Sequence, residues 1–311
     1  MAKGDQLHQI SSSSIIERIQ ELKEKKNAII LAHNYQSGEV QDIADYLGDS
    51  LELSQKAAKS NADVIVFCGV RFMAETASIL CPKKTVLVPE SDAKCPMANM
   101  ITAESLRTLK QKWPNAIVVC YINTTASVKA ESDICCTSSN AVKVVEISKE
   151  NEAIFVPDKY LAHYVSTKVE KKIIPWHGFC PTHVKILPEH IKKQRKLHPN
   201  AEVMVHPECT PPVIALADIV LSTGGMCKYA RTSKAKEIIV GTEVGLLHRL
   251  KKENPDKMFF PASELAVCPN MKLTTLEKVL WSLEDMKHEV RVPQAVAMKA
   301  RKAVEKMLVI H

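Results

Sequence analysis

Short apolar runs alternate with longer amphipathic stretches along most of the chain. Runs such as "AIILA" (28–32) and "AIVVC" (116–120) are continuously apolar, which is typical of strands buried on both faces of a parallel sheet. The stretches between them, such as "IIERIQELKEKK", place apolar residues at helical spacing among lysines and glutamates. This alternation predicts an α/β fold, in which helices cover parallel sheets.

The pattern occurs three times. The segments "KNAIILAHNY", "PNAIVVCYIN" and "PNAEVMVHPE" align on Ala28, Ala116 and Ala201, which are 88 and 85 residues apart. A lysine-rich, helix-like segment precedes each of them, and two further strand-like runs follow, such as "ADVIVFCG" and "KTVLVPE" in the first copy. We call these copies the first, second and third repeat, and we expect each to form one domain of the same fold.

The repeats share three kinds of polar position: a ring five residues after the alanine, a second polar group two residues later, and a hydroxyl 17 residues after the ring. In this order the positions are His33, Tyr121 and His206, then Tyr35, Asn123 and Glu208, then Ser50, Ser138 and Thr223. An aspartate precedes each hydroxyl by five residues. Acid–base groups that recur at one strand end suit proton transfer. Hydroxyls at helix starts cap the helix or bind phosphate and carboxylate groups, and we expect both duties, with Gly224-Gly225 letting the backbone approach an anion.

Each repeat then reaches a Cys-Pro pair, at Cys95, Cys180 or Cys268, which follow the hydroxyls by 45, 42 and 45 residues. Three thiolates can bind zinc or three irons of a [4Fe–4S] cluster. Structural zinc sites use four protein ligands, often in close pairs, so we predict the cluster, with one iron open as a Lewis acid. The other cysteines are predicted to be small buried residues: Cys68, Cys81, Cys120, Cys135, Cys136, Cys209 and Cys227.

We therefore predict three α/β domains in a pseudo-threefold arrangement, at residues 14–95, 96–180 and 181–288, the last range including a connecting helix, with residues 289–311 packing back on the first. Ligands of parallel sheets bind beyond the carboxyl ends of the strands. Because the shared polar positions fall at or just beyond strand ends or at helix starts, we expect all of them to face one central site.

Composition excludes several classes of protein. A hydrophobic content of 46% with 25% charged residues is that of an ordinary soluble domain. No apolar run approaches the roughly 20 residues of a membrane helix, and the polar "MAKGDQLHQISSSS" lacks the apolar core of a signal peptide, so we expect a cytoplasmic protein that does not bind membranes. The net charge of +7 is spread along the chain and aromatics make up 5%, so nucleic-acid binding is not expected.

Nine motifs, in order and through every repeat, resemble the quinolinate synthase family from about residue 14 to the end. They are "LAHNYQ", "DIADYLGDSLEL", "CPMAN", "YINTTA", "CTSSNAV", "HPEC", "STGGM", "GTEVGLLHRL" and "AVCPNMK". The resemblance implies a pseudo-threefold fold with a [4Fe–4S] cluster on Cys95, Cys180 and Cys268. Some members carry a Cys-x-x-Cys-x-x-Cys segment near the third ligand, whereas "AVCPNMKL" has one cysteine, so no disulfide control is expected here.

The resemblance also implies an activity: condensation of iminoaspartate (iminosuccinate) with dihydroxyacetone phosphate to quinolinate, phosphate and two waters, a transferase reaction of NAD (pyridine nucleotide) biosynthesis. It implies that a separate aspartate-oxidising enzyme supplies the iminoaspartate. The family's substrate-binding positions correspond to His33, Ser50, Tyr121, Asn123, Ser138, His206, Glu208 and Thr223. Tyr35 matches a catalytic residue, and we expect it to transfer protons together with His33, His206 and Glu208.

Two other functions are compatible with the residues alone. A cluster-dependent hydro-lyase would dehydrate a hydroxy acid without releasing phosphate. An iron–sulfur or zinc sensor would bind metal without turnover, but it leaves the repeated acid–base positions unexplained. His177 and His183 flank Cys180 without partners in the other repeats, so their roles stay open.

Overall fold

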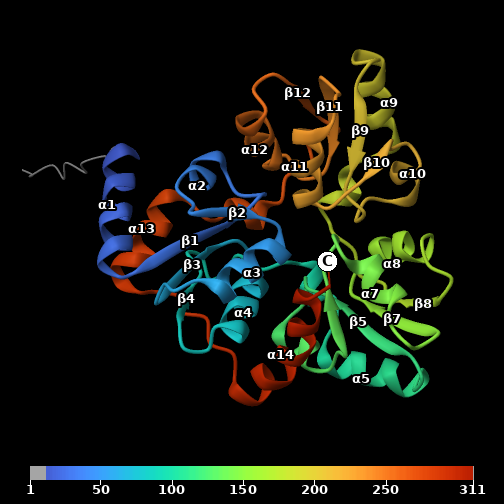
Figure 1. Cartoon of the computed structure of the whole chain (residues 1–311), viewed down its shortest axis with the longest axis horizontal. Coiled ribbons are helices and arrows are strands. Elements are labelled where there is room, and N and C mark those ends of the chain that lie inside the picture. The colour runs from blue at the N-terminus through green and yellow to red at the C-terminus, as the bar shows by residue number, and fades with distance from the viewer. Residues whose placement is uncertain (1–11, 311) are drawn as a thin grey trace, which may run out of the picture.

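The computed structural model describes residues 12–310, which form three lobes around a common centre (Figure 1). Each lobe contains a four-stranded parallel sheet with helices on its faces, so the predicted α/β fold with three similar domains is confirmed. None of the helices between residues 12 and 310 is both long and apolar enough to cross a membrane.

The elements follow one another in the same order in each lobe. The first lobe contains α1 (Ser12–Lys25), β1 (Ala28–His33), α2 (Gly38–Asp42), β2 (Tyr46–Gly48), α3 (Ser50–Lys59), β3 (Val64–Cys68), α4 (Arg71–Leu80), β4 (Thr85–Leu87) and the 3₁₀ helix η1 (Met97–Asn99). The second contains α5 (Ala103–Lys112), β5 (Ile117–Tyr121), α6 (Ala126–Ala130), β6 (Ile134–Cys136), α7 (Ala141–Glu146), β7 (Glu152–Val156), α8 (Lys159–Ser166), β8 (Lys172–Pro175) and η2 (His183–Lys185). The third contains α9 (Pro188–Leu197), β9 (Glu202–Val205), α10 (Pro211–Ile214), β10 (Ile219–Val220), α11 (Thr223–Thr232), β11 (Glu237–Gly241), α12 (Leu246–Glu253), β12 (Met258–Pro261) and η3 (Pro269–Lys272). Two helices follow, α13 (Leu276–Asp285) and α14 (Gln294–Leu308).

The strand order is the same in all three sheets: β2-β1-β3-β4, β6-β5-β7-β8 and β10-β9-β11-β12. The sequence predicted three strands per repeat and missed the edge strands β2, β6 and β10. These strands are only two or three residues long, which is too short for a period to be visible. Because of them, the first strand of each repeat is central in its sheet, and the polar ring at its end lies in the middle of the carboxyl edge.

The repeated aspartate holds the edge strand against the central strand. The Asp45 carboxylate accepts the backbone N–H of Ile30 at 2.7 Å, and the Asp45 N–H donates to the Ile30 carbonyl at 2.9 Å. Asp133 and Asp218 make the same pair of bonds with the matching residues of β5 and β9, and both carboxylate bonds measure 2.8 Å. These aspartates therefore build the sheets and do not belong to the site.

Replacing Asp133 with alanine is expected to lower the free energy of unfolding by about 1.5–3 kcal/mol, because the N–H of Val118 loses a charged acceptor. Urea unfolding measures this loss. The matched control is Asp256→Ala, which removes an exposed ion pair with Lys236 and should cost less than about 1 kcal/mol. Equal losses in the two variants would show that the repeated bond does not stabilise the sheet.

The last two helices depart from the expected layout. α13, the connecting helix expected after the third repeat, packs on α1 of the first lobe. Residues 288–290 then run beside β4, where the Val290 N–H donates to the Val86 carbonyl at 2.8 Å. α14 packs on α4 of the first lobe but also covers α6 and β6 of the second, a contact that the predicted return to the first domain did not include. The predicted limits at 95/96 and 180/181 stay predictions.

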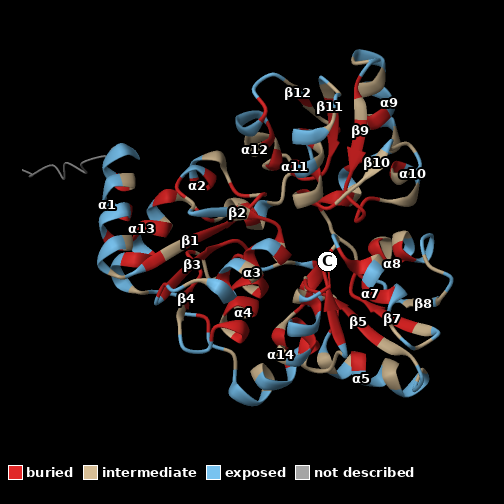
Figure 2. Ribbon diagram, in the orientation of Figure 1, coloured by how far each residue is buried: buried red, intermediate tan, exposed pale blue. Residues whose placement is uncertain are grey.

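The first two lobes share one hydrophobic core, the first lobe has a second core between its sheet, α1 and α13, and the third lobe has cores of its own. The two central strands of each sheet are largely buried (Figure 2). One continuous cluster connects Phe67 of the first lobe, Phe155 of the second and Val304 of α14. The third sheet instead carries two separate clusters, one containing Val203 and the other Met204. Neighbouring residues of a strand point to opposite faces, so these clusters cover the two sides of one sheet.

Candidate active site

One cavity lies where the three lobes meet. Every site residue predicted from the sequence lines it: His33, Tyr35, Ser50, Cys95, Tyr121, Asn123, Ser138, Cys180, His206, Glu208, Thr223 and Cys268. The volume of this cavity is about 60 Å³. That is room for a few waters, since one water needs roughly 10–15 Å³ of such space. The roles of these residues stay predictions, but their matched positions do meet at one centre.

Three cysteines differ from the others in their exposure. Cys95, Cys180 and Cys268 are half-buried and line the cavity, each in the loop that follows the last strand of a sheet. The remaining seven are buried, as predicted for small residues of the core, and all ten are free thiols. The cavity therefore receives one half-buried cysteine from each repeat.

The same turn follows each of these cysteines. A proline comes next, and η1, η2 or η3 begins within three residues. The backbone N–H groups two and three residues later donate to the sulfur: Met97 and Ala98 to Cys95, Thr182 and His183 to Cys180, Asn270 and Met271 to Cys268. Burial raises the pKa of all three thiols, that of Cys95 to about 12, and these N–H groups oppose the rise because they stabilise a thiolate. Paired N–H donors at sulfur are a feature of metal and iron–sulfur sites.

The arrangement of donors fits a cluster with several irons. Within residues 12–310, the donor atoms that all lie within 4.8 Å of one another, close enough for a single ion, belong to Cys180, His183 and Glu208. Cys95 and Cys268 are not part of that group. Three thiols distributed around a cavity match ligands to separate irons. The type of cluster stays a prediction.

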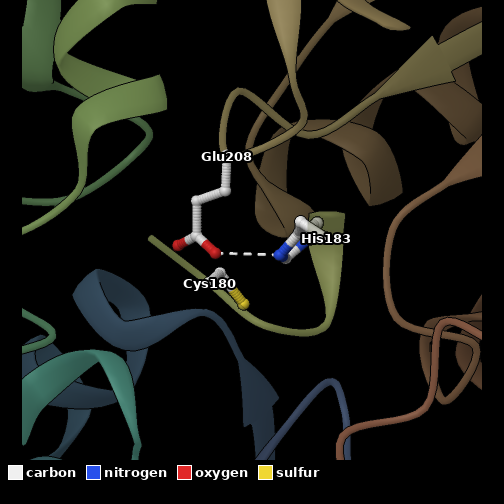
Figure 3. A group of neighbouring side chains, drawn as sticks. All are labelled: Cys180, His183 and Glu208. Atoms are coloured by element: carbon white, nitrogen blue, oxygen red, sulfur yellow. Dashed lines mark ion pairs between the residues drawn. The ribbon is translucent and has the colours of Figure 1, made fainter. Parts of the chain in front are cut away.

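A buried carboxylate, Glu208, faces Cys180 and His183 in the cavity (Figure 3). Its Oε2 lies 2.8 Å from Nδ1 of His183, and its Oε1 accepts the hydroxyl of Tyr121 at 2.5 Å. Burial alone raises the pKa of Glu208, but the facing His183 and His206 and the Tyr121 hydrogen bond outweigh it, so the pKa lies below its usual range. Glu208 is therefore an ionised acceptor at the centre of a hydrogen-bonded group.

Tyr35 reaches this group from the first lobe. Its hydroxyl lies 2.6 Å from Oγ1 of Thr242 and 3.4 Å from Nε2 of His183, and the same Nε2 lies 2.9 Å from Thr242 Oγ1. Burial, followed by the negative charge of Glu208, raises the pKa of Tyr35 well above its ordinary value. Tyr35 therefore keeps its proton at neutral pH and can donate it.

His33 and His206 are neutral rings held in the same way. Nδ1 of His33 accepts the N–H of Tyr35 at 3.2 Å, and Nδ1 of His206 accepts the N–H of Glu208 at 3.3 Å. Each ring therefore carries its proton on Nε2. In His206 this atom lies 3.1 Å from Oγ of Ser138. Burial lowers both pKa values to about 3, so the two repeats supply N–H donors without positive charge.

The burial of neutral His33 is expected to reduce stability in acid. Its pKa is about 3 in the folded protein and 6.5 ordinarily, so the unfolded chain binds one more proton as the pH falls below 6.5, and the contribution of His33 is lost towards pH 3. Urea midpoints of a His33→Gln variant should therefore change less between about pH 8 and pH 5 than those of the unmodified protein. Burial raises the pKa of Asp49 to about 6, so Asp49 stabilises the fold as the pH falls. This effect is the same in both proteins and does not alter the comparison. The same pH dependence in both would contradict the expectation.

The hydroxyls do not cap helices, contrary to the expected double duty. Asp49 caps α3 by accepting two of its N–H groups at 3.0 Å, and Ser222 caps α11. Ser50 and Thr223 come one residue later, while Ser138 precedes α7, and all three face the cavity. Oγ of Ser138 lies 3.1 Å from Nε2 of His206 and Oγ1 of Thr223 accepts an N–H of Asn34 at 3.0 Å, so both hydroxyls still have an O–H to donate to a ligand.

Gly224 lies at a close contact between lobes, and the anion contact expected of Gly224-Gly225 stays a prediction. A Cβ at this position would lie 2.8 Å from Oδ2 of Asp49, which comes from the first lobe. Asn123 adds a group suited to a ligand, since its buried Oδ1 has no hydrogen-bond partner among residues 12–310.

Several residues at the site escaped the sequence analysis. Glu243 is buried, accepts the N–H of Cys268 at 3.1 Å and pairs with Lys272 at 3.0 Å. Asp158 has the matching position, two residues after β7, and the backbone N–H of Cys180 is among the groups that oppose the rise of its pKa on burial. The acid that ends both "FVPD" and "VGTE" could have identified these two residues from the sequence. His183 had no such signal.

His177, the other histidine left open, stacks on Trp176 with ring centres 4.4 Å apart and does not line the cavity.

Comparison with known proteins gives matches along almost the whole chain. The family model described as Quinolinate synthetase A protein matches residues 17–309. The quinolinate synthase of Dehalococcoides mccartyi (strain CBDB1) is 60% identical over 94% of this chain and 97% of its own length. That of Methanosarcina barkeri (strain Fusaro) is 57% identical over 97% and 99%, and that of Thermodesulfovibrio yellowstonii is 56% identical over 95% and 98%.

Proposed function

Since the chain belongs to the quinolinate synthetase A protein family, whose named members are enzymes of NAD biosynthesis, we propose that it condenses iminoaspartate with dihydroxyacetone phosphate to quinolinate, phosphate and two waters. One observation carries the proposal: the positions matched across three repeats line a single cavity together with three half-buried cysteines. A condensation of two small anions needs such a site, in which polar donors and acid–base groups converge.

The reaction balances without an oxidant or a reductant. Iminoaspartate contributes the nitrogen and four carbons, and dihydroxyacetone phosphate contributes three carbons. Loss of one phosphate and two waters leaves the ring of quinolinate with all electrons accounted for. We therefore propose that an iron–sulfur group in this enzyme stabilises charge on the substrate and orients it, and does not transfer electrons.

A [4Fe–4S] cluster is proposed to be held by Cys95, Cys180 and Cys268, whose sulfurs already receive N–H donors. When bound, it would supply a Lewis-acidic iron to a substrate oxygen. Asp158 and Glu243 would keep two of the cysteine loops in place through the backbone N–H groups of Cys180 and Cys268.

The polar wall would bind the substrates. Ser138 and Thr223 would donate to the phosphate or a carboxylate, with Ser50 completing the set of hydroxyls. Asn123 and Tyr121 would orient the bound acid. The uncharged Nε2–H groups of His33 and His206 would donate to substrate oxygens without holding a phosphate too tightly to leave.

Proton transfer is proposed for Glu208 and Tyr35. Glu208 can accept a proton during isomerisation and water loss, and Tyr121 and His183 stabilise its charge between steps. Tyr35 keeps its proton and can donate it to a departing hydroxyl. The contact of both with His183 provides a path along which the proton can return.

We further propose that the enzyme works in the cytoplasm beside a separate enzyme that oxidises aspartate, because iminoaspartate is short-lived in water. Membranes and nucleic acids have no part in the proposal.

Anaerobic purification with iron analysis and a quinolinate assay tests the proposal. About four irons per chain, together with quinolinate and one phosphate per turnover from the two substrates, are the expected result. Dehydration of a hydroxy acid without phosphate release would identify the hydro-lyase alternative. Bound metal with no turnover of either kind would identify a sensor.

A further inference from the structure

Three side chains of different chemistry meet on one side of the cavity (Figure 3). Cys180 offers a sulfur, His183 a nitrogen and Glu208 a carboxylate oxygen, and these atoms all lie within 4.8 Å of one another. His183 and Glu208 are buried, and Cys180 is half-buried at the cavity wall. Surface acids that meet by chance lack this combination of donors and burial.

This donor set is one that zinc and similar ions prefer. Catalytic zinc sites use three protein ligands drawn from cysteine, histidine and carboxylate and leave a fourth position open. One thiolate and one carboxylate balance the charge of a divalent ion, which lowers the cost of burying it. The open position would face the cavity.

The surroundings support metal binding through Nδ1 of His183. A ligating histidine usually donates its other N–H to an oxygen, which fixes the ring. Nε2 of His183 lies 2.9 Å from Oγ1 of Thr242, so that partner is already present. Nδ1 and Oε2 of Glu208, now 2.8 Å apart, would separate to about 3.3 Å, the spacing of two tetrahedral ligands around zinc.

We propose that Cys180, His183 and Glu208 form a binding site for a single divalent transition-metal ion, and that an ion there excludes the iron–sulfur cluster. The exclusion rests on the proposed function, because Cys180 is shared by the two sites. Binding releases the thiol proton of Cys180 to solvent, and Nδ1 of His183 also gives up the proton that now faces Oε2 of Glu208, so that the ring keeps a proton on Nε2 only; no electrons move. The site is therefore a point at which the wrong metal can block the enzyme before its cluster is assembled.

Cobalt binding to the cluster-free full chain tests the site directly. Co²⁺ should bind at about one per chain with a sulfur-to-cobalt absorption band, and Zn²⁺ should displace it. Cys180→Ser, His183→Asn and Glu208→Gln should each weaken Co²⁺ binding by more than about 100-fold. Circular dichroism of each variant separates loss of a ligand from loss of the fold.

The matched controls are Cys95→Ala and Cys268→Ala, which remove ligands of the proposed cluster but none of this site. Both should bind Co²⁺ as the unmodified chain does. Loss of Co²⁺ in either control would assign the ion to the three cysteines, and unchanged binding in Cys180→Ser would place it elsewhere; both results overturn the proposal.

Exclusion is tested by iron content. One equivalent of Zn²⁺ added before anaerobic reconstitution with iron and sulfide should reduce the iron incorporated at least about tenfold, and a chelator should restore it. Full iron incorporation in the presence of bound zinc would overturn the exclusion. A chain that binds Co²⁺ as described but makes no quinolinate would leave this site standing and reject the proposed function.

Discussion

Replacing Glu208 with glutamine is expected to lower quinolinate formation by about 100- to 10,000-fold, the usual contribution of a general acid–base group. The amide is nearly isosteric but cannot take up a proton, and it loses the ion pair with His183 at 2.8 Å. The cluster ligands are unchanged, so the iron content should equal that of the unmodified enzyme. Initial rates and iron analysis on one preparation separate the two effects.

Glu202→Gln is the matched control for this variant. Glu202 lies on β9, six residues before Glu208, and accepts the hydroxyl of Tyr229 outside the cavity. The control should retain ordinary turnover. If Glu208→Gln also turned over normally, Glu208 would have no part in the mechanism. If the Glu208→Gln variant lost its iron, the role of Glu208 would be to retain the metal.

Alanine at Cys95, Cys180 or Cys268 is expected to abolish both the cluster and the product, since two thiolates hold too few of the irons. Each variant should contain less than about a tenth of the iron of the unmodified protein after anaerobic reconstitution. Visible absorption, iron analysis and the quinolinate assay are the measurements.

Cys227→Ala is the control for the cysteine series. Cys227 is buried on α11 and does not line the cavity, so this variant should keep its iron and activity at a modest cost in stability. A full iron complement in any one of the three cavity variants would remove that cysteine from the ligand set.

Most of the site residues that could be predicted from the sequence were found through the threefold repeat. Equivalent positions in the three copies support one another, so His33, Tyr121 and His206 could be predicted from the sequence alone to share one site. The same comparison separated Cys95, Cys180 and Cys268 from seven buried cysteines. Periodicity within one copy alone would have supported the α/β class but would not have singled out these residues.

Residues and strands without a recognisable counterpart in the other repeats could not be predicted in this way. His183 has no counterpart, and its role depends on a loop that brings it 2.8 Å from Glu208. The edge strand β10 has two residues, and only pairing with β9 makes it a strand. The caps of α3 and α11 were misassigned by one residue, because Asp49 and Ser222 can cap a helix as well as the hydroxyl residues that follow them.

The shared core has a consequence for how the chain is made. α14 ends three residues before the C-terminus, and its Ala300, Val304 and Met307 are buried in contacts with the first two lobes. The core shared by the first two lobes can be completed only after α14 has been synthesised, whereas the third lobe, with cores of its own, precedes α14 in the chain and can finish earlier. The shared core, which includes residues of the first sheet, is therefore expected to be completed after the cores of the third lobe, although the first sheet is synthesised earlier.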